Sequence, residues 1–212
     1  AVQAGAQTTG KARYLTVIAL MAAISYILAF LEVPMPLAPS FARMDASDVP
    51  ALLTTFALGP VAGTVVELIK NVLQALSTST GGIGELANFL MGASLVFTAG
   101  LIYKQKKTRK MAVVSCVAGS VAMGIMAAIM NYFVLLPMYQ IFMPIDQVIA
   151  SFAEVIPFIH TKLDVVLYSA LPGNILKGLI VSVITMLVYK RVSPAMKDRK
   201  STRLNSSHAE LS

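Results

Sequence analysis

Long, predominantly apolar runs recur along the 212-residue chain and constrain its fold more than any other feature. A membrane-spanning helix needs about 20 apolar residues, because it must cross about 30 Å of hydrocarbon. Only 13% of the residues are charged, whereas an ordinary soluble domain carries about 25%. The pattern therefore predicts an all-α membrane protein. The runs are Tyr14–Leu31, Val49–Leu76, Leu86–Tyr103, Met111–Leu136 and Leu171–Tyr189.

Lysine and arginine residues gather in three clusters that flank these runs. Such basic flanks are typical of the cytoplasmic side of membrane proteins, so we predict that all three clusters face the cytoplasm. The net charge of +7 comes with no basic face or RNA-reading motif, which argues against nucleic-acid binding. We expect contacts with anionic lipid headgroups of the membrane or with a cytoplasmic partner instead. The clusters are Lys11 and Arg13, then Lys104, Lys106, Lys107, Arg109 and Lys110, and finally Lys190, Arg191, Lys197, Arg199, Lys200 and Arg203.

The longest apolar run contains a break at Gly59-Pro60. Proline cannot continue a helix, and the residue before it avoids the helical region of backbone space. We therefore divide the run into two short helices, about 49–58 and 61–76, joined by a tight turn. This division predicts a six-transmembrane-helix bundle with both termini in the cytoplasm. The alternative, one kinked span over 49–76, places the basic 104–110 loop outside the cell, against the charge bias.

The other segments divide the chain into one membrane domain with two flanks. We expect residues 1–10 to be disordered, residues 11–195 to form the six-helix domain, and residues 196–212 to be a basic tail ending in a polar, non-native scar. Prolines make the outer segment 32–47 extended. The segment 137–170 is expected to be a long outer loop that holds a short surface helix.

Polar side chains within the runs concentrate in the outer half of the predicted bundle. Such groups are costly in a membrane and by default mark function. Amides both donate and accept hydrogen bonds, as a neutral ligand with carbonyl, ring-nitrogen and hydroxyl groups requires, and aromatic rings beside them can stack on a flat ligand. We predict a pocket that is open outward and sealed below. The candidate ligand-binding residues are Asn131, Asn174, Lys177, Glu85, Asn88, Asp48, Phe41 and Tyr132.

Some of these polar residues also have a purely structural explanation. Glu85 suits the first turn of a helix, where the helix dipole favours an acid, and this is as plausible as ligand contact. Asp48, just before Val49-Pro50, is typical of a helix N-cap, and we favour capping for it. Glu67 and Lys70, three residues apart on one helix, are expected to neutralise each other.

The amides and the last lysine differ in how strongly they indicate a ligand. Asn131 is equally well explained as a hydrogen-bonding link between helices. Asn174 and Lys177 share one helix face because they are three residues apart. Since Lys177 has no acid near it in the sequence, the ligand interpretation is favoured for this pair.

Small residues line one face of the first apolar run. The spacing of Ala19 and Ala23 allows another helix to approach closely. Docking of a partner membrane protein and ordinary packing within the bundle explain this face equally well.

Motifs of enzymes and of metal sites are absent from the sequence. It has no Walker lysine loop and no hydrolase or metalloprotease motif, so we expect neither an enzyme nor a metal or cofactor. Cys116 is the only cysteine and is expected to be a small buried apolar side chain. Uphill transport would need energy from a partner or an ion gradient. An alternative function is a stand-alone secondary transporter or channel for a small polar solute, which only Glu67, deeper in the bundle, supports.

Several short motifs, in this order and spacing, resemble those of the riboflavin-specific substrate-binding S-components of energy-coupling factor (ECF) transporters. The resemblance covers about residues 12–195. The motifs are Asp45-Ala46-Ser47-Asp48-Val49-Pro50, Thr55-Phe56-Ala57-Leu58-Gly59-Pro60-Val61-Ala62-Gly63, Lys70-Asn71, Ala87-Asn88-Phe89-Leu90-Met91-Gly92-Ala93, Asn131-Tyr132-Phe133-Val134-Leu135-Leu136-Pro137 and Pro172-Gly173-Asn174-Ile175-Leu176-Lys177-Gly178.

The resemblance implies a role in vitamin uptake across a bacterial cell membrane. Such a protein captures riboflavin from outside and docks on one transmembrane coupling subunit and two cytoplasmic ATPases. Riboflavin is then a transported ligand and not a cofactor. By this resemblance, Asn131, Asn174 and Lys177 would hydrogen-bond the flavin, the first outer loop would cap the pocket, and Ala19 and Ala23 would face the coupling subunit.

Overall fold

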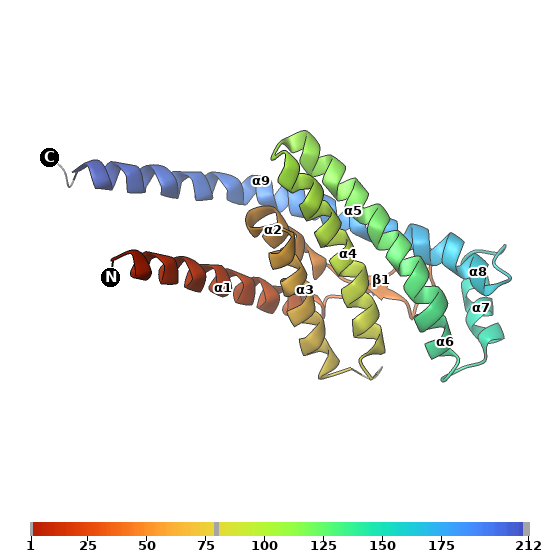
Figure 1. Cartoon of the computed structure of the whole chain (residues 1–212). Coiled ribbons are helices and arrows are strands. Elements are labelled where there is room, and N and C mark those ends of the chain that lie inside the picture. The colour runs from red at the N-terminus through yellow and green to blue at the C-terminus, as the bar shows by residue number, and fades with distance from the viewer. Residues whose placement is uncertain (1, 79–80, 210–212) are drawn as a thin grey trace.

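The chain folds mostly into helices in this computed structural model (Figure 1). The structure describes residues 2–78 and 81–209, with side chains for residues 11–78 and 81–190. The expectations for residues 1–10 and 196–212 lie outside the residues with described side chains. The elements are α1 (Val2–Leu28), β1 (Val33–Pro34), β2 (Arg43–Met44), α2 (Asp48–Leu58), α3 (Pro60–Ala75), α4 (Ile83–Gln105), α5 (Arg109–Met130), the π-helical turn η1 (Asn131–Leu135), α6 (Leu136–Tyr139), α7 (Ile145–Ala153), α8 (Lys162–Val165), the π-helical turn η2 (Val166–Ala170) and α9 (Leu171–Ala209).

Four helical segments of the described chain are long and apolar enough to cross a membrane. They confirm four of the predicted spans, and they cover Lys11–Leu28, Ile83–Gln105, Arg109–Tyr139 and Lys162–Lys190. Helix α2 has 11 residues and α3 has 16. At about 1.5 Å per residue, these two helices measure about 16 and 24 Å, less than the hydrocarbon layer.

The predicted break in the longest apolar run is confirmed. Helix α2 ends at Leu58, and α3 begins at Pro60. Gly59 between them has a φ of 105°, a backbone conformation that glycine adopts freely and L side chains avoid. Proline then starts the next helix at a position where its missing N–H costs nothing. Because these two residues separate the helices, a single kinked span over 49–76 is not formed.

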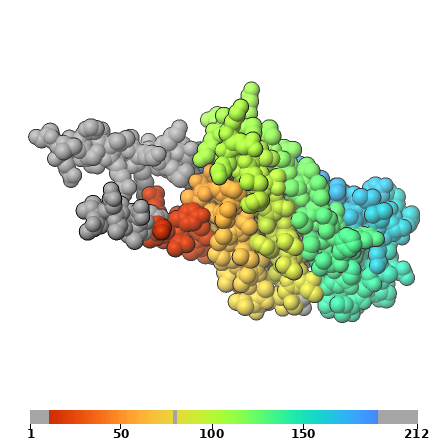
Figure 2. All heavy atoms as spheres, in the orientation of Figure 1, coloured from red at the N-terminus to blue at the C-terminus, as the bar shows by residue number. Residues whose placement is uncertain are grey.

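Six helices, α1 to α5 and α9, pack around one apolar core. On the face shown in Figure 2, α3, α4 and α5 lie side by side. Ala22, Ala62 and Ala99 are buried between the helices, and such small side chains let helix backbones approach closely in a membrane. Cys116 is buried in the same core, which confirms its assignment as a small apolar side chain.

The segment 137–170 is largely helical, so its prediction as a loop was wrong in part. Helix α6 extends α5 to Tyr139, and α8 with η2 carries the last helix back to Lys162. The early start follows from a reciprocal cap, in which Thr161 Oγ1 accepts from the Asp164 N–H at 3.2 Å and Asp164 Oδ2 accepts from the Thr161 N–H at 2.8 Å. Helix α7 is the expected short helix. A second apolar cluster joins these pieces, through Leu136, Val148, Phe152, Ile156, Ile159, Val165 and Val166.

One end of the bundle, which we call the basic end, brings together two of the basic clusters. The ring centroid of Phe56, near the end of α2, lies 4.8 Å from that of Tyr103 and 6.5 Å from that of Tyr189. These contacts place the turn at Gly59 beside the 104–110 loop and beside Lys190.

The opposite end, which we call the polar end, holds the start of α2. Here Ser25 Oγ of α1 donates to the carbonyl of Ser47, the residue before α2. Helix α1 therefore reaches the polar end at Ser25, and Lys11 and Arg13 lie nearer the other end of this helix. The described residues of the second and third basic clusters thus share one end of the bundle.

Candidate ligand-binding site

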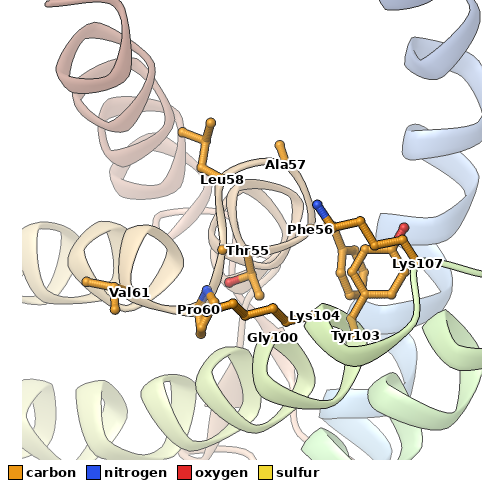
Figure 3. A pocket seen from close by; sticks show the side chains of 11 residues that line it. Thr55, Phe56, Ala57, Leu58, Pro60, Val61, Gly100, Tyr103, Lys104 and Lys107 are labelled. Carbon is orange, nitrogen blue, oxygen red and sulfur yellow. The ribbon is translucent and has the colours of Figure 1, made fainter. Parts of the chain in front are cut away.

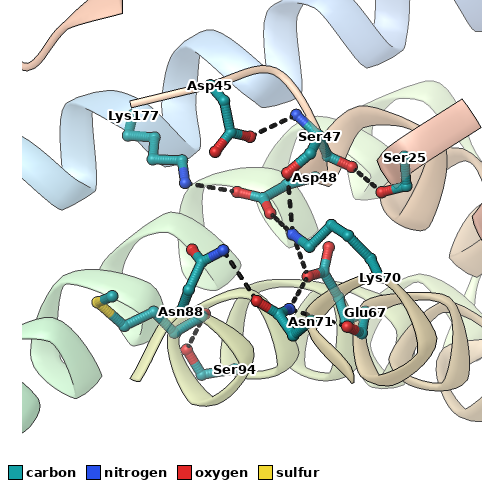
Figure 4. A network of polar contacts seen from close by, with 11 residues as sticks. Ser25, Asp45, Ser47, Asp48, Glu67, Lys70, Asn71, Asn88, Ser94 and Lys177 are labelled. Atoms are coloured by element: carbon teal, nitrogen blue, oxygen red, sulfur yellow. Dashed lines mark hydrogen bonds and ion pairs between the residues drawn. The ribbon is translucent and has the colours of Figure 1, made fainter. Parts of the chain in front are cut away.

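Asp48, the first residue of α2, lies between two lysines from other helices (Figure 4). Its Oδ1 accepts a hydrogen bond from Lys70 Nζ of α3 at 2.8 Å, and its Oδ2 lies 3.1 Å from Lys177 Nζ of α9. The side chains of Asp48 and Lys70 are 0% exposed, and that of Lys177 is 7% exposed. One carboxylate therefore joins α2, α3 and α9 inside the bundle.

Lys70 extends this contact into a network that reaches a fourth helix. Its Nζ lies 2.6 Å from Glu67 Oε2 and donates to Ser47 Oγ at 2.9 Å. The amide of Asn71 donates to the Glu67 carbonyl at 2.8 Å, and Asn88 Nδ2 of α4 donates to Asn71 Oδ1 at 3.0 Å. We call the side chains of Ser47, Asp48, Glu67, Lys70, Asn71, Asn88 and Lys177 the polar network.

The polar network contains as many acids as lysines. It contains two carboxylates, Asp48 and Glu67, and two ammonium groups, Lys70 and Lys177. A buried ion that loses its partner costs about 3–5 kcal/mol, whereas a paired and hydrogen-bonded group is tolerated. The acids lie within ion-pair distance of the lysines, which explains how two buried ammonium groups are tolerated within a largely apolar bundle.

A glycine on α4 makes room for the carboxylate of the polar network. A Cβ built on Gly92 would lie 2.6 Å from Glu67 Oε2 and 3.4 Å from Asp48 Oδ1. The first distance is shorter than a van der Waals contact, so any side chain at this position would displace Glu67. The absence of a side chain at Gly92 thus lets α4 pack directly against the acids.

Asn131 and Asn174 both lie beside π-helical turns. Asn131 begins η1, and Asn174 follows η2 by one turn. The two π-helical turns contact each other. Each amide nitrogen donates to the carbonyl four residues earlier at 2.8 Å, to Ala127 and Ala170 respectively. Wide turns of this kind are frequent at functional sites. Asn174 is buried and Asn131 is half-buried.

The aromatic candidates lie in two separate places. Phe41, in the segment between β1 and β2, makes edge-on contacts with Tyr139 and Phe152, with ring centroids 5.7 and 6.0 Å apart. Tyr132 lies on η1, is 42% exposed, and contacts Phe133 with centroids 5.0 Å apart. The ring of Phe41 therefore holds the segment between β1 and β2 against α6 and α7.

The structure revises the explanations that the sequence favoured for the ionised residues. The assignment of Asp48 as a helix N-cap was wrong, because Ser47 holds that position and Asp48 pairs with lysines from two other helices. The expected pairing of Glu67 with Lys70 is confirmed. Glu85 lies half-buried in the first turn of α4.

A hollow of about 290 Å³ lies at the basic end, far along α2 from Asp48 (Figure 3). Its lining includes Phe56, Tyr103, Lys104 and Lys107. None of the predicted ligand-binding residues lines it. At the polar end, the side chains of the polar network pack against one another.

Lys70, Ser47 and Asn71 belong to the polar network but were not among the predicted site residues. The signal that points to them is the position of polar groups on the buried face of an otherwise apolar helix, since Lys70 and Asn71 are buried on α3. Lys70 was instead assigned to neutralise Glu67 alone, and its contact with Asp48 crosses between helices.

Comparison with known proteins identifies related chains over most of the length. A family model described as the substrate-specific component of ECF transporters matches residues 13–189. The riboflavin transporter RibU of Staphylococcus aureus (strain TCH60) is 38% identical over 184 residues, which cover 86% of this chain and 92% of that protein. The riboflavin transporter FmnP of Bacillus subtilis (strain 168) is 30% identical over 198 residues, which cover 92% and 100%.

The fold has a counterpart among solved structures. A structure described as the S component of a bacterial ECF transporter matches with a TM-score of 0.70 and 35% sequence identity. The match covers 88% of this chain and 99% of that one. The relatives named above are components of transporters and not enzymes.

Proposed function

This chain belongs to the family of substrate-specific components of ECF transporters, and on that premise we propose that it captures riboflavin from outside the cell for uptake. The family and the apolar helices make it a multi-pass protein of a bacterial cell membrane. The observation that carries the choice of riboflavin is the similarity to RibU of S. aureus, at 38% identity over 86% of this chain.

The proposed topology has six crossings, with both termini and the 104–110 loop in the cytoplasm. It is supported by the common position of the 104–110 loop and Lys190 at one end of the bundle, which the contacts of Phe56 with Tyr103 and Tyr189 define. In this topology α2 runs inward to the turn at Gly59, and α3 runs outward from it. Neighbouring helices shield both of these short helices from lipid in part. The polar end then faces the exterior.

The proposed flavin contacts are Asn131, Asn174 and Lys177. They are supported by their position at the polar end, near the paired π-helical turns and the buried ammonium. Lys177 still has N–H groups to donate after its contact with Asp48, because an ammonium carries three. The first outer segment, held by Phe41, would cap the site.

We further propose that α1 docks on a transmembrane coupling subunit that works with two cytoplasmic ATPases. Ala19 and Ala23 are exposed on α1, and large apolar side chains of the same helix, such as Leu20 and Ile27, are exposed with them. A face of small residues allows a second helix to approach closely. The sequence has no phosphate-binding loop of its own, which is why the energy would come from partners.

The alternative of a stand-alone transporter or channel depended on Glu67 as an isolated polar group deep in the bundle. Glu67 is instead enclosed and paired with Lys70. The described residues therefore favour a ligand-binding subunit.

Purification from riboflavin-containing medium tests the proposal directly. The protein should carry the yellow absorbance of bound flavin and should quench riboflavin fluorescence on titration. Colourless protein that leaves the fluorescence unchanged would exclude riboflavin as the ligand. Flavin uptake by liposomes that contain this chain alone would contradict the need for ATPase partners.

A further inference from the structure

We infer that Asp48 acts as a positioning residue that holds the Lys177 ammonium toward the ligand, without contacting the ligand itself. This inference rests on the proposed function, because it assigns a role to Asp48 within the proposed riboflavin site. It also separates Asp48 from the other candidate ligand-binding residues.

Burial and its two lysine partners close Asp48 to a ligand. Its Oδ1 accepts from Lys70 at 2.8 Å, its Oδ2 faces Lys177 at 3.1 Å, and its side chain is 0% exposed. Lys177 is the outer member of the pair, since its side chain keeps 7% exposure. A ligand that enters from the polar end would therefore meet the ammonium and not the carboxylate.

A lysine needs such a partner to bind a ligand in one geometry. Its ammonium sits on a flexible four-carbon stem with several rotatable bonds. Contact with a buried carboxylate restricts the stem and points the remaining N–H groups away from Asp48. Asp48 is itself fixed, because it begins α2 directly after Ser47, whose N–H donates to Asp45 Oδ1 at 2.7 Å and whose carbonyl accepts from Ser25.

The remaining pair, Glu67 with Lys70, has a different role in this arrangement. Lys70 contacts both acids, and Glu67 approaches Lys70 from the same helix at 2.6 Å. Neither residue contacts Lys177 among the ion pairs of the described side chains. Removal of Glu67 and Lys70 together should therefore leave the Asp48–Lys177 contact in place.

Two double variants test this division. D48N/K70M and E67Q/K70M each remove Lys70 and one acid, so they differ only in which acid is lost. We expect D48N/K70M to weaken riboflavin binding about tenfold or more and E67Q/K70M to change it about threefold or less, each measured by fluorescence quenching of purified protein. Equal losses in the two variants would overturn the inference, because the polar network would then act only as a structural unit.

A second comparison distinguishes positioning from a contribution to folding. In a K177M background, D48N/K70M should cause no further loss of affinity, because Asp48 acts through Lys177. A loss as large as in the unaltered background would show that Asp48 does not act through Lys177.

If D48N/K70M does not fold, Asp48→Glu replaces it. This substitution keeps the carboxylate but displaces it, and the same comparison applies. If the unaltered protein does not bind riboflavin, the proposed function is rejected. If the unaltered protein binds riboflavin and D48N/K70M binds it equally well, only the role of Asp48 is rejected.

Discussion

The carboxylate of Asp48 lies 3.1 Å from the ammonium of Lys177 and 2.8 Å from that of Lys70, so the first residue of α2 holds two other helices by ionic contacts. In a membrane, ionised groups are rare and usually mark a site of function. Here they are gathered at the end of the bundle opposite the 104–110 loop and Lys190. This position links the electrostatics of the fold to the place where the ligand is proposed to bind.

The amide of Asn174 should contribute to riboflavin affinity. Asn174→Ala removes a buried donor and acceptor, and we expect it to weaken binding by about 1–3 kcal/mol, because a partner on the ligand is left unpaired. Fluorescence titration of the purified variant measures the change. Ser94→Ala is a suitable control, since the hydrogen bond of its side chain to the Met91 carbonyl at 2.7 Å stays within its own helix. Equal affinity for Asn174→Ala and the unaltered protein would remove Asn174 from the site.

Larger side chains on α1 should separate docking from ligand binding. Ala19→Leu combined with Ala23→Leu fills the exposed small-residue face and should abolish co-purification of the coupling module. Riboflavin affinity should stay unchanged, because both residues lie on the exposed side of α1. The control Leu20→Ile alters an exposed apolar residue of the same helix without adding volume. Normal co-purification of the double variant would place the docking surface elsewhere.

The ring of Phe41 should hold the first outer segment in place. Phe41→Ala removes edge-on contacts with Tyr139 and Phe152, each worth about 0.5–1.5 kcal/mol. Amide hydrogen exchange in residues 33–44 should accelerate, and bound riboflavin should dissociate faster if this segment caps the site. Leu37→Ala, at an exposed position of the same segment, should change neither rate. Unaltered exchange in Phe41→Ala would show that the ring contacts do not restrain the segment.

A side chain at Gly92 should disturb the polar network. The new Cβ of Gly92→Ala would fall 2.6 Å from Glu67 Oε2, so α4 or the acid must move. Small-to-large changes in a tightly packed interior cost about 1–3 kcal/mol, and the thermal unfolding midpoint of the purified protein should fall accordingly. Phe97→Leu, at an exposed position of α4, is the matched change and should leave the midpoint unaltered. An unchanged unfolding midpoint for Gly92→Ala would mean that α4 can shift to accommodate the methyl group without loss of stability.

Most of the helices follow from local properties of the sequence. Apolar runs of sufficient length predicted the long spans, and Gly59-Pro60 predicted the division of α2 from α3, since both signals depend on residues close together in the chain. The early start of the last helix was missed, because the reciprocal cap of Thr161 and Asp164 was read as part of a loop.

The site was harder to predict, because its contacts join distant segments. The pairing of Glu67 with Lys70 could be predicted from the sequence, because both residues lie on one helix face. The partners of Asp48 come from α3 and α9, and no spacing rule connects them. Capping was the best local explanation for Asp48, and only the packing of three helices shows that its carboxylate is used elsewhere.

The hydrogen bond from Ser25 of α1 to the Ser47 carbonyl has a thermodynamic consequence. The bond links α1, which is proposed to dock on the coupling subunit, to Ser47, the residue before Asp48. Coupling between two binding events is reciprocal, so the factor by which docking at α1 alters riboflavin affinity must equal the factor by which riboflavin alters docking. Measurement of either equilibrium, with and without the other component, therefore yields the coupling free energy of both.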